Sequence, residues 1–372
     1  MRLLSFELKK IVFSKKFLYL MLLIIIGIAA LFLRNSTFGA YIEKEELQTI
    51  EAQIKTSQSN SSAHRTALER DPDNETEERL QAINRPILEA LYELVPILKT
   101  DDWESKLVLQ NEILMQTVEY KEEGGDHPLS YKEISHTLAL NQKLLDEGIM
   151  PEHEKYSVAW PNFMKQVVDL FINLGALIII LLLIGETLSS EFENHSINLL
   201  FTQPLKKTLI IMSKFWSSVI LYLFTTGIIL VSTMVIGLVY GEKGTFDYPV
   251  LIEKNNAIGF LTISEYMIQA IIVVSATIVM VIALYLLYSL LFKHTLSTLF
   301  VLLGTLLGGY ALTALVSWSS FAWFNPFQYL MPGEAILFQN DRVWYEGIPI
   351  ILLLTVVFYW IATRKIKSSR IE

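Results

Sequence analysis

Residues 186–214 read ETLSSEFENHSINLLFTQPLKKTLIIMSK and lie between two long apolar segments. The stretch contains three acidic residues, then an apolar cluster, a proline and a group of lysines. The cluster is too short to cross a membrane, whereas each flanking segment is long enough. This order predicts a short amphipathic helix that lies outside the bilayer, between two membrane spans.

The composition of the whole chain agrees with a membrane protein. Of its 372 residues, 52% are hydrophobic, and the mean hydropathy is +0.41. The chain has no cysteine, which excludes disulfides, thiolate metal sites and thiol nucleophiles. We therefore expect a polytopic membrane protein that is held together by packing.

Six segments contain apolar runs of about 17 to 25 residues, the length that a helix needs to cross the bilayer. They lie at about 17–33, 166–185, 209–240, 262–291, 295–317 and 346–363. The first follows two lysines, as a signal peptide does, but no Ala-x-Ala-like cleavage site follows it. We predict that it is retained, which gives an all-α fold with six transmembrane helices.

The cations near the span ends predict the orientation, because Lys and Arg stay on the cytoplasmic side. They cluster at the N-terminus, between spans two and three, at Lys293 and at the C-terminus. These positions alternate along the chain, so both termini are predicted to be cytoplasmic. Residues 34–165 are then extracellular, and 186–214 are cytoplasmic.

Residues 1–33 are predicted to form an amphipathic helix followed by the first span. On residues 3–13, four apolar side chains share one helical face: Leu4, Leu8, Ile11 and Val12. Lys9 and Lys10 lie off that face, as in helices that lie in the membrane interface. Ser14 precedes the first span and can cap it.

Residues 34–165 are predicted to form a helical extracellular domain. Helical spacing recurs over 41–58 and 76–98, with a polar loop over 57–74 between them. Two further helices are predicted to begin at a cap at Asp101 or Asp102 and at a capping box over Ser130-Tyr-Lys-Glu133, and both end at glycines. Pro86 and Pro96 are expected to kink or end the 76–98 helix.

The charge of this domain differs from that of the remainder. It contains about 25 acidic and 14 basic residues, whereas the remainder is slightly basic. An acidic surface of this kind attracts cationic partners. The alternative is that the acidic residues only solvate an exposed helical domain.

Residues 166–372 are predicted to contain spans two to six. Between the last two spans, residues 318–345 are rich in aromatic residues and contain Pro326 and Pro332. The segment either returns into the membrane as a short re-entrant element or forms an aromatic belt at headgroup level.

Polar residues inside the spans are candidates for a substrate pathway. Asp169 and Asn173 share a face of span two, and Glu265 and Gln269 share a face of span four. They either contact substrate headgroups or hydrogen-bond water at the interface. Gly304 and Gly308 of span five allow another helix to approach closely.

Common catalytic motifs are absent from the sequence. It contains no Gly-x-x-x-x-Gly-Lys-Ser/Thr, no His-Glu-x-x-His and no Gly-x-Ser-x-Gly. The chain therefore has no ATPase site of the P-loop type, no metal site is predicted, and we do not expect an enzyme.

The 186–214 loop is the main candidate for a binding site. Glu191 and Glu193 precede a turn that Asn194 or Ser196 can cap. An apolar cluster follows, and Pro204 ends it: Ile197, Leu199, Leu200 and Phe201. Such a helix is suited to dock into a groove on a soluble partner. The alternative is a solvated loop, which would leave the cluster exposed.

This loop resembles that of permease subunits of ABC-2 type exporters. Their pattern is Glu-x-Glu-x-Gly-Thr, hydrophobic residues, Pro and a basic residue, with a Lys that opens span three. Here it reads Glu191-Phe-Glu-Asn-His-Ser-Ile197, then Pro204, Lys206 and Lys214. The sequence departs from the pattern at His195, where Gly is usual, and at Ser196, where Thr is usual.

The resemblance implies a permease subunit that pairs with a second permease, identical or related, and with two ATP-binding subunits. Residues Glu191 to Phe201 would be the coupling helix, within a segment of about 186–204. ATP and Mg would bind to the partner, so no cofactor is expected in this chain, and no nucleic acid partner is expected.

The large domain between spans one and two resembles those of Gram-positive permeases linked to peptide, bacteriocin or antibiotic export and immunity. We therefore expect an exporter of peptides or amphipathic toxins in a plasma membrane. Lipid or polysaccharide export is an alternative. A non-transporting receptor or scaffold is a further one, although the tails are too short for a signalling domain.

Overall fold

The structure is a computed structural model that describes residues 2–185, 187–202, 204, 206–255, 257–315, 325–339 and 343–368. The chain forms two compact units. The bundle unit comprises Met1–Phe32, Val158–Phe246 and Ile252–Glu372. The insert unit comprises Leu33–Ser157 and Asp247–Leu251.

Six helices in the described part of the chain are long and apolar enough to cross a membrane. Five are regular helices, each overlapping a predicted span: α2 (Lys15–Thr37), α11 (Lys207–Tyr240), α12 (Ile263–Phe292), α13 (Thr295–Leu315) and α15 (Ile348–Ser368). The prediction of an all-α polytopic membrane protein is therefore confirmed.

Span two is interrupted, which the sequence did not predict. It consists of α7 (Trp160–Val167), a π-helix η1 (Val168–Leu174) and α8 (Gly175–Ile184). A Cβ at Gly175 would lie only 3.0 Å from the carbonyl oxygen of Leu170. π-Helical turns are rare, and those that occur are often at functional sites. Span two is therefore a candidate for a functional site.

The core of the bundle unit is built around α12. Met280, Ala283 and Tyr285 of this helix are fully buried, because α11, α13, α15 and span two pack around it. The helix is apolar on all sides, as expected of a buried helix. The surrounding helices expose large apolar side chains, for example Leu23 on α2 and Leu353 on α15.

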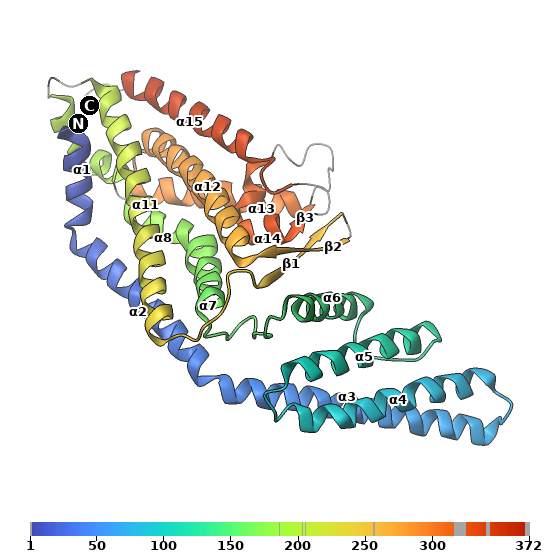
Figure 1. Cartoon of the computed structure of the whole chain (residues 1–372). Coiled ribbons are helices and arrows are strands. Elements are labelled where there is room, and N and C mark those ends of the chain that lie inside the picture. The colour runs from blue at the N-terminus through green and yellow to red at the C-terminus, as the bar shows by residue number, and fades with distance from the viewer. Residues whose placement is uncertain are drawn as a thin grey trace. The chain divides into compact units, whose positions relative to one another are not determined.

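The N-terminal helix α1 (Arg2–Val12) packs against α11. Ser14 follows it, and its Oγ accepts a hydrogen bond from the Phe17 amide at 3.1 Å, as the predicted cap requires. Within the bundle unit, α1 and the C-terminal end of α15 lie at the same end (Figure 1). This placement agrees with termini on one side of a membrane, and the side itself remains a prediction.

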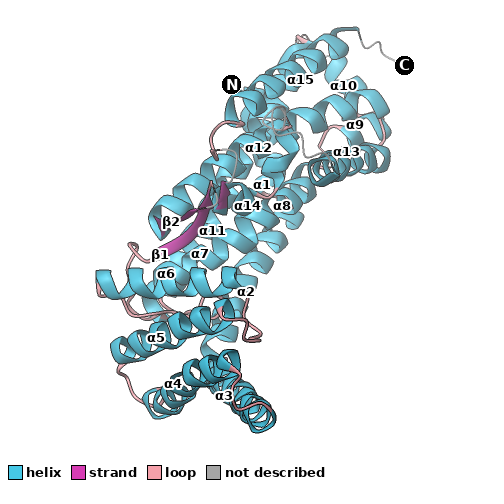
Figure 2. Cartoon of the chain, turned by 90° about the vertical axis from the view of Figure 1, so that its right-hand side faces the viewer, coloured by secondary structure: helices cyan, strands magenta, loops and turns pink. Residues whose placement is uncertain are grey.

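A small three-stranded sheet was not predicted. It has the order β2-β1-β3 and is formed by β1 (Pro249–Lys254), β2 (Ala257–Thr262) and β3 (Phe338–Gln339). Strand β1 runs parallel to β3, with Glu253 opposite Phe338. Figure 2 shows the sheet beside α14 (Pro332–Leu337).

The predicted aromatic loop is described only in part, because Trp318, Phe321, Trp323 and Phe324 lie outside the described residues. The described part contains a 3₁₀-helix η3 (Pro326–Leu330) and α14, each of which begins at a proline. Its depth in the membrane remains a prediction.

The insert unit contains four helices: α3 (Gly39–Arg70), α4 (Glu75–Ile97), α5 (Trp103–Glu122) and α6 (Tyr131–Glu147). Its core includes Ile50, Leu91 and Ile113. The predicted caps are present: Asp102 accepts from the Ser105 amide at 3.1 Å, and Ser130 forms a capping box.

The prediction of a loop over residues 57–74 is wrong, because α3 continues to Arg70. Polar side chains of α3 are paired with α4: Ser57 Oγ donates to Asn84 Oδ1 at 2.8 Å, and His64 Nδ1 lies 2.6 Å from Glu77 Oε2. Each pair provides hydrogen-bond partners for polar groups between the two helices. Without partners, burying these groups would cost free energy. Pro86 does not end α4, whereas Pro96 lies in its last turn.

Candidate functional site

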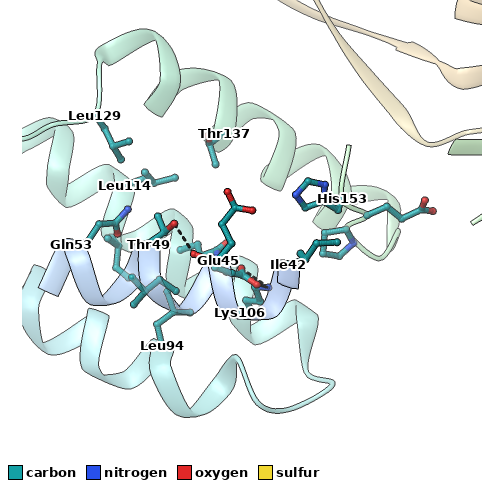
Figure 3. Close-up of a pocket in the computed structure, with 16 residues that line it drawn as sticks. Ile42, Glu45, Thr49, Gln53, Leu94, Lys106, Leu114, Leu129, Thr137 and His153 are labelled. Carbon is teal, nitrogen blue, oxygen red and sulfur yellow. Dashed lines mark hydrogen bonds and ion pairs between the residues drawn. The ribbon is translucent and has the colours of Figure 1, made fainter. Parts of the chain in front are cut away.

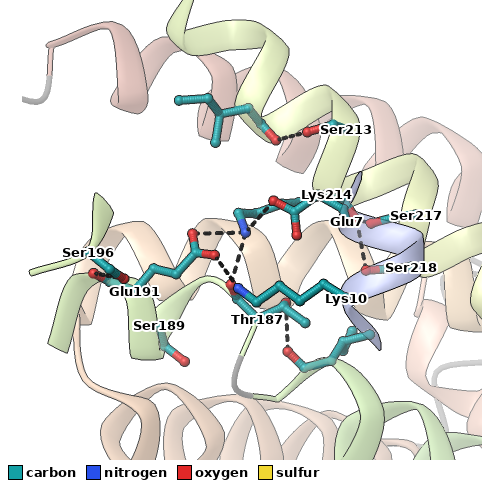
Figure 4. Close-up of polar contacts among 12 residues, drawn as sticks. Glu7, Lys10, Thr187, Ser189, Glu191, Ser196, Ser213, Lys214, Ser217 and Ser218 are labelled. Atoms are coloured by element: carbon teal, nitrogen blue, oxygen red, sulfur yellow. Dashed lines mark hydrogen bonds and ion pairs between the residues drawn. The ribbon is translucent and has the colours of Figure 1, made fainter. Parts of the chain in front are cut away.

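Charged side chains from α1, α9 (Ser189–Glu193) and α11 meet inside the bundle unit. Lys214 Nζ lies 3.1 Å from Glu7 Oε1 and 2.9 Å from Glu191 Oε2. The other carboxylate oxygen of Glu191 lies 3.0 Å from Lys10 Nζ. Figure 4 shows these four side chains, which we call the ion cluster, converging from the three helices.

The ion cluster is deeply buried on one side. The side chain of Lys214 is 1% exposed and that of Glu7 is 3% exposed, whereas that of Lys10 is 51% exposed. Lys214 Nζ also donates a hydrogen bond to the carbonyl oxygen of Thr187 at 3.0 Å. Two carboxylates and two ammonium groups balance in charge, so burial is tolerated only while all of them stay in place.

Local sequence explains how Glu7 reaches the cluster. It lies three residues after Leu4 and four before Ile11, on the apolar face of α1 that packs against α11. Glu7 was not predicted, and Lys214 was predicted only as the lysine that opens span three. An acid within an apolar helix face is the signal that identifies such a residue.

The coupling segment, residues 187–204, contains two one-turn helices where one helix was predicted. These are α9 and α10 (Ile197–Phe201), and Glu186 lies outside the described residues. Between them, His195 has a φ of 57°, in the left-handed region. Glycine, the residue usual at this position in the pattern that the loop resembles, adopts this conformation without strain.

The predicted cap at Ser196 is wrong. Ser196 precedes α10, but its side chain caps none of the α10 amides. Its Oγ instead donates to the carbonyl oxygen of Glu191 at 3.4 Å, which ties the turn back to α9.

The apolar residues of α10 differ in exposure. Ile197 is 3% exposed and belongs to the core, whereas Leu199 is 71% exposed. Leu200 and Phe201 are half-buried, and Lys207 Nζ lies 4.7 Å from the centre of the Phe201 ring. The helix ends before Pro204, which is exposed. Leu199 is therefore the side chain of this cluster that is most available to a partner.

The coupling segment is also bonded to α12 and α13. Glu193 Oε2 accepts from the amide of Thr295, the first residue of α13, at 3.1 Å. This contact places a carboxylate at a helix N-terminus, where the helix dipole favours it. Ser189 Oγ lies 3.2 Å from the Tyr285 hydroxyl of α12.

The polar residues predicted to share faces inside the spans are only partly brought together. Asp169 and Asn173 of η1 meet Tyr266 of α12: Asp169 Oδ1 accepts from the Tyr266 hydroxyl at 2.5 Å and from Asn173 Nδ2 at 3.0 Å. Lys165 Nζ lies 3.1 Å from Asp169 Oδ2. We call these four residues the η1 cluster.

Glu265 and Gln269 do not belong to the η1 cluster. Glu265 forms a capping box with Thr262 at the start of α12, where its carboxylate accepts from the Thr262 amide at 2.9 Å. Gln269 is half-buried, and its Oε1 has no hydrogen-bond partner among the described residues.

Gly304 and Gly308 make no close approach to the residues that the structure describes. A Cβ at either position would meet no atom of these residues within 4 Å. The close approach on α13 is at Gly309 instead, where a Cβ would overlap the ring of Phe327. Asn325 Nδ2 donates to the Gly309 carbonyl oxygen at 3.2 Å, so this glycine fixes η3 against α13.

In the described part of the chain, no group of three or more His, Asp or Glu side chains is placed to hold a metal ion. At the coupling segment, hydrogen bonds and ion pairs connect the short helix α9 to α1, α11, α12 and α13.

Six long apolar helices in the described part of the chain define a multi-pass membrane protein. Residues 1–322 match the family model described as ABC-2 family transporter protein. The chain belongs to this family, whose members are membrane subunits that work with a separate ATP-binding subunit. Comparison with curated proteins and with solved structures gave no match.

Proposed function

We propose that the chain is the permease subunit of an ATP-driven exporter, and that the coupling segment receives the movement of the ATP-binding subunit. One observation carries this proposal: the coupling segment is bonded to α1, α11, α12 and α13. A partner that moves this segment therefore acts on four helices of the bundle unit.

In this mechanism, Leu199 docks into an apolar groove of the ATP-binding subunit. Force on α9 and α10 passes through Glu191 to Lys214 on α11 and to Lys10 on α1. Because buried ion pairs depend strongly on geometry, the three helices move together and do not separate. ATP and Mg stay on the partner subunit.

The assembly that we propose contains two ATP-binding subunits and a second permease, identical or related. It lies in a plasma membrane with both termini cytoplasmic and the insert unit outside, in a Gram-positive bacterium. The positive residues at the span ends support this orientation.

The proposed substrate is a peptide, bacteriocin or other amphipathic toxin or antibiotic. The acidic insert unit supports a cationic substrate, since a charged surface raises the local concentration of opposite charges. The η1 cluster supplies polar groups within the bundle that a substrate would meet.

Proteoliposomes that contain the chain and its ATP-binding subunit test this function. We expect ATP-dependent accumulation of a fluorescent cationic amphipathic peptide, and loss of accumulation in Glu191→Gln with ATPase binding retained. If the proteoliposomes accumulated a lipid or a polysaccharide instead of the peptide, the proposed substrate class would be wrong. ATPase binding without any transport would favour a receptor or scaffold.

A further inference from the structure

The insert unit contains a cavity of about 520 Å³ between α3, α5, α6 and the segment that follows α6. All of its lining residues belong to this unit, so the cavity lies within one compact body. Its volume falls within the range of about 300–1,000 Å³ that is usual for ligand sites. Neither the ion cluster nor the coupling segment contributes to it.

The floor of the cavity is apolar. Leu94, Ile113 and Leu114 line it and are buried in the structure. Ile50 of α3, which is also buried, completes this surface. An apolar group that enters the cavity would leave water, and this burial favours its binding.

The charged lining residues are three acids and one lysine. Lys106 Nζ pairs with Glu46 at 2.7 Å, and Glu152 accepts from Ser157 Oγ at 2.5 Å. The Glu45 carboxylate has no ion pair or hydrogen bond with any described residue. Figure 3 shows it pointing from α3 across the cavity toward Thr137 of α6.

We infer that this cavity binds a segment of a cationic amphipathic peptide, with a Lys or Arg side chain at Glu45 and an apolar side chain over Leu94 and Leu114. The inference rests on the proposed function, because it gives the exporter's substrate class a binding site. An unpaired carboxylate beside an apolar floor matches a cation that is joined to an apolar group.

The surrounding charge favours the same ligand. Residues 34–165, most of which form the insert unit, include about 11 more acidic than basic residues, a charge that repels anionic peptides and attracts cationic ones. Gln53 and Gln110 also line the cavity, without side-chain hydrogen bonds to described residues. They offer donors and acceptors to a peptide backbone.

The absence of cysteine makes a protection assay possible in the full chain. A single cysteine is placed at the rim of the cavity by Thr137→Cys, and its reaction rate with a maleimide is measured in detergent. The probe is the amidated tripeptide Leu-Leu-Lys. We expect the probe to slow the reaction saturably at this position, and not at a control cysteine introduced by Ser59→Cys, outside the cavity.

The charge at Glu45 is then removed without a change of shape. Glu45→Gln is expected to weaken protection by Leu-Leu-Lys at least tenfold, whereas Glu43→Gln, an exposed carboxylate of α3 outside the cavity, leaves it unchanged. The acidic analogue Leu-Leu-Glu should not protect. Thermal melting of each variant checks that the fold is retained.

Two results would overturn the inference: no saturable protection at the Thr137→Cys cysteine, or equal protection in Glu45→Gln and the parent. The assay needs neither ATP nor the partner subunit. Peptide export without this binding would therefore refute the site alone, and binding without export would refute the proposed function alone.

Discussion

Lys214 on α11 lies 3.1 Å from Glu7 on α1, and both side chains are almost fully buried. The two residues are 207 positions apart in the sequence, so the contact joins the N-terminal helix to the third span. Glu191 of the coupling segment shares the same ammonium group. Lys214 therefore connects three separate parts of the chain: α1, the coupling segment and α11.

Replacement of this lysine tests that connection. Lys214→Met leaves Glu7 buried without a countercharge and leaves Glu191 with the half-exposed Lys10 alone, and we expect a loss of about 3–5 kcal/mol in the free energy of unfolding. SDS-induced unfolding in mixed micelles measures it. The matched control is Lys206→Met, at an exposed lysine of the same loop, which we expect to stay within about 0.5 kcal/mol of the parent. Equal stability of the two variants would show that the ion cluster contributes little.

The backbone at His195 gives a second prediction. Its φ of 57° is strained for histidine, so His195→Gly is expected to stabilise the coupling segment or leave it unchanged. His195→Val is expected to destabilise it by about 1–2 kcal/mol, because a β-branched residue tolerates this conformation poorly. Hydrogen exchange of the α9 and α10 amides distinguishes the two. Faster exchange in the Gly variant than in the Val variant would contradict the assigned conformation.

Acid should loosen two helix ends of the insert unit. Hydrogen bonds donated by Ser105 lower the pKa of Asp102, and those donated by Ser130 lower the pKa of Glu133. Both pKa values are thus below their unfolded values, so each carboxylate stabilises its helix above the ordinary carboxyl pKa. The stabilisation is lost as the pH falls through the lowered folded value.

Hydrogen exchange of the first turns of α5 and α6, corrected for intrinsic rates, measures this effect. Protection should fall at acidic pH in the parent. In Asp102→Asn the first turn of α5 should no longer respond to acid, while α6 still does. A response of α5 that is identical in both proteins would rule out Asp102 as the titrating group.

The orientation of the chain can be tested at Ser59, which is exposed on α3. The introduced cysteine of Ser59→Cys should react with an impermeant maleimide in intact cells, because residues 34–165 are predicted to be extracellular. A cysteine introduced by Ser368→Cys at the end of α15 should react only after lysis. Labelling of the Ser368→Cys cysteine in intact cells, with labelling at Ser59→Cys only after lysis, would show that the chain has the opposite orientation.

The sequence predicted those features that depend on local pattern. The predicted span 262–291 agrees with α12 (Ile263–Phe292) to within one residue, because the length of an apolar run is decided locally. The capping box at Ser130 was found for the same reason, since its partner lies three residues away.

Features that depend on contacts between distant residues were missed. The extension of α3 depends on pairs such as Ser57 with Asn84, and the burial of Glu7 depends on Lys214. For the candidate site, Glu191 was named from the sequence, but its contacts with Lys10 and Lys214 were not predicted. The left-handed turn at His195 was missed as well, because histidine seldom adopts that conformation.

The central claim is that the coupling segment binds an ATP-binding subunit through Leu199. The most direct measurement is recovery of that subunit with the affinity-tagged chain, identified by ATP photolabelling, from cells that express both. Leu199→Asp should reduce recovery at least tenfold while membrane insertion is retained. Thr202→Asp, which adds the same charge at an exposed position just after α10, should recover the subunit as the parent does. Unchanged recovery with Leu199→Asp would contradict the claim.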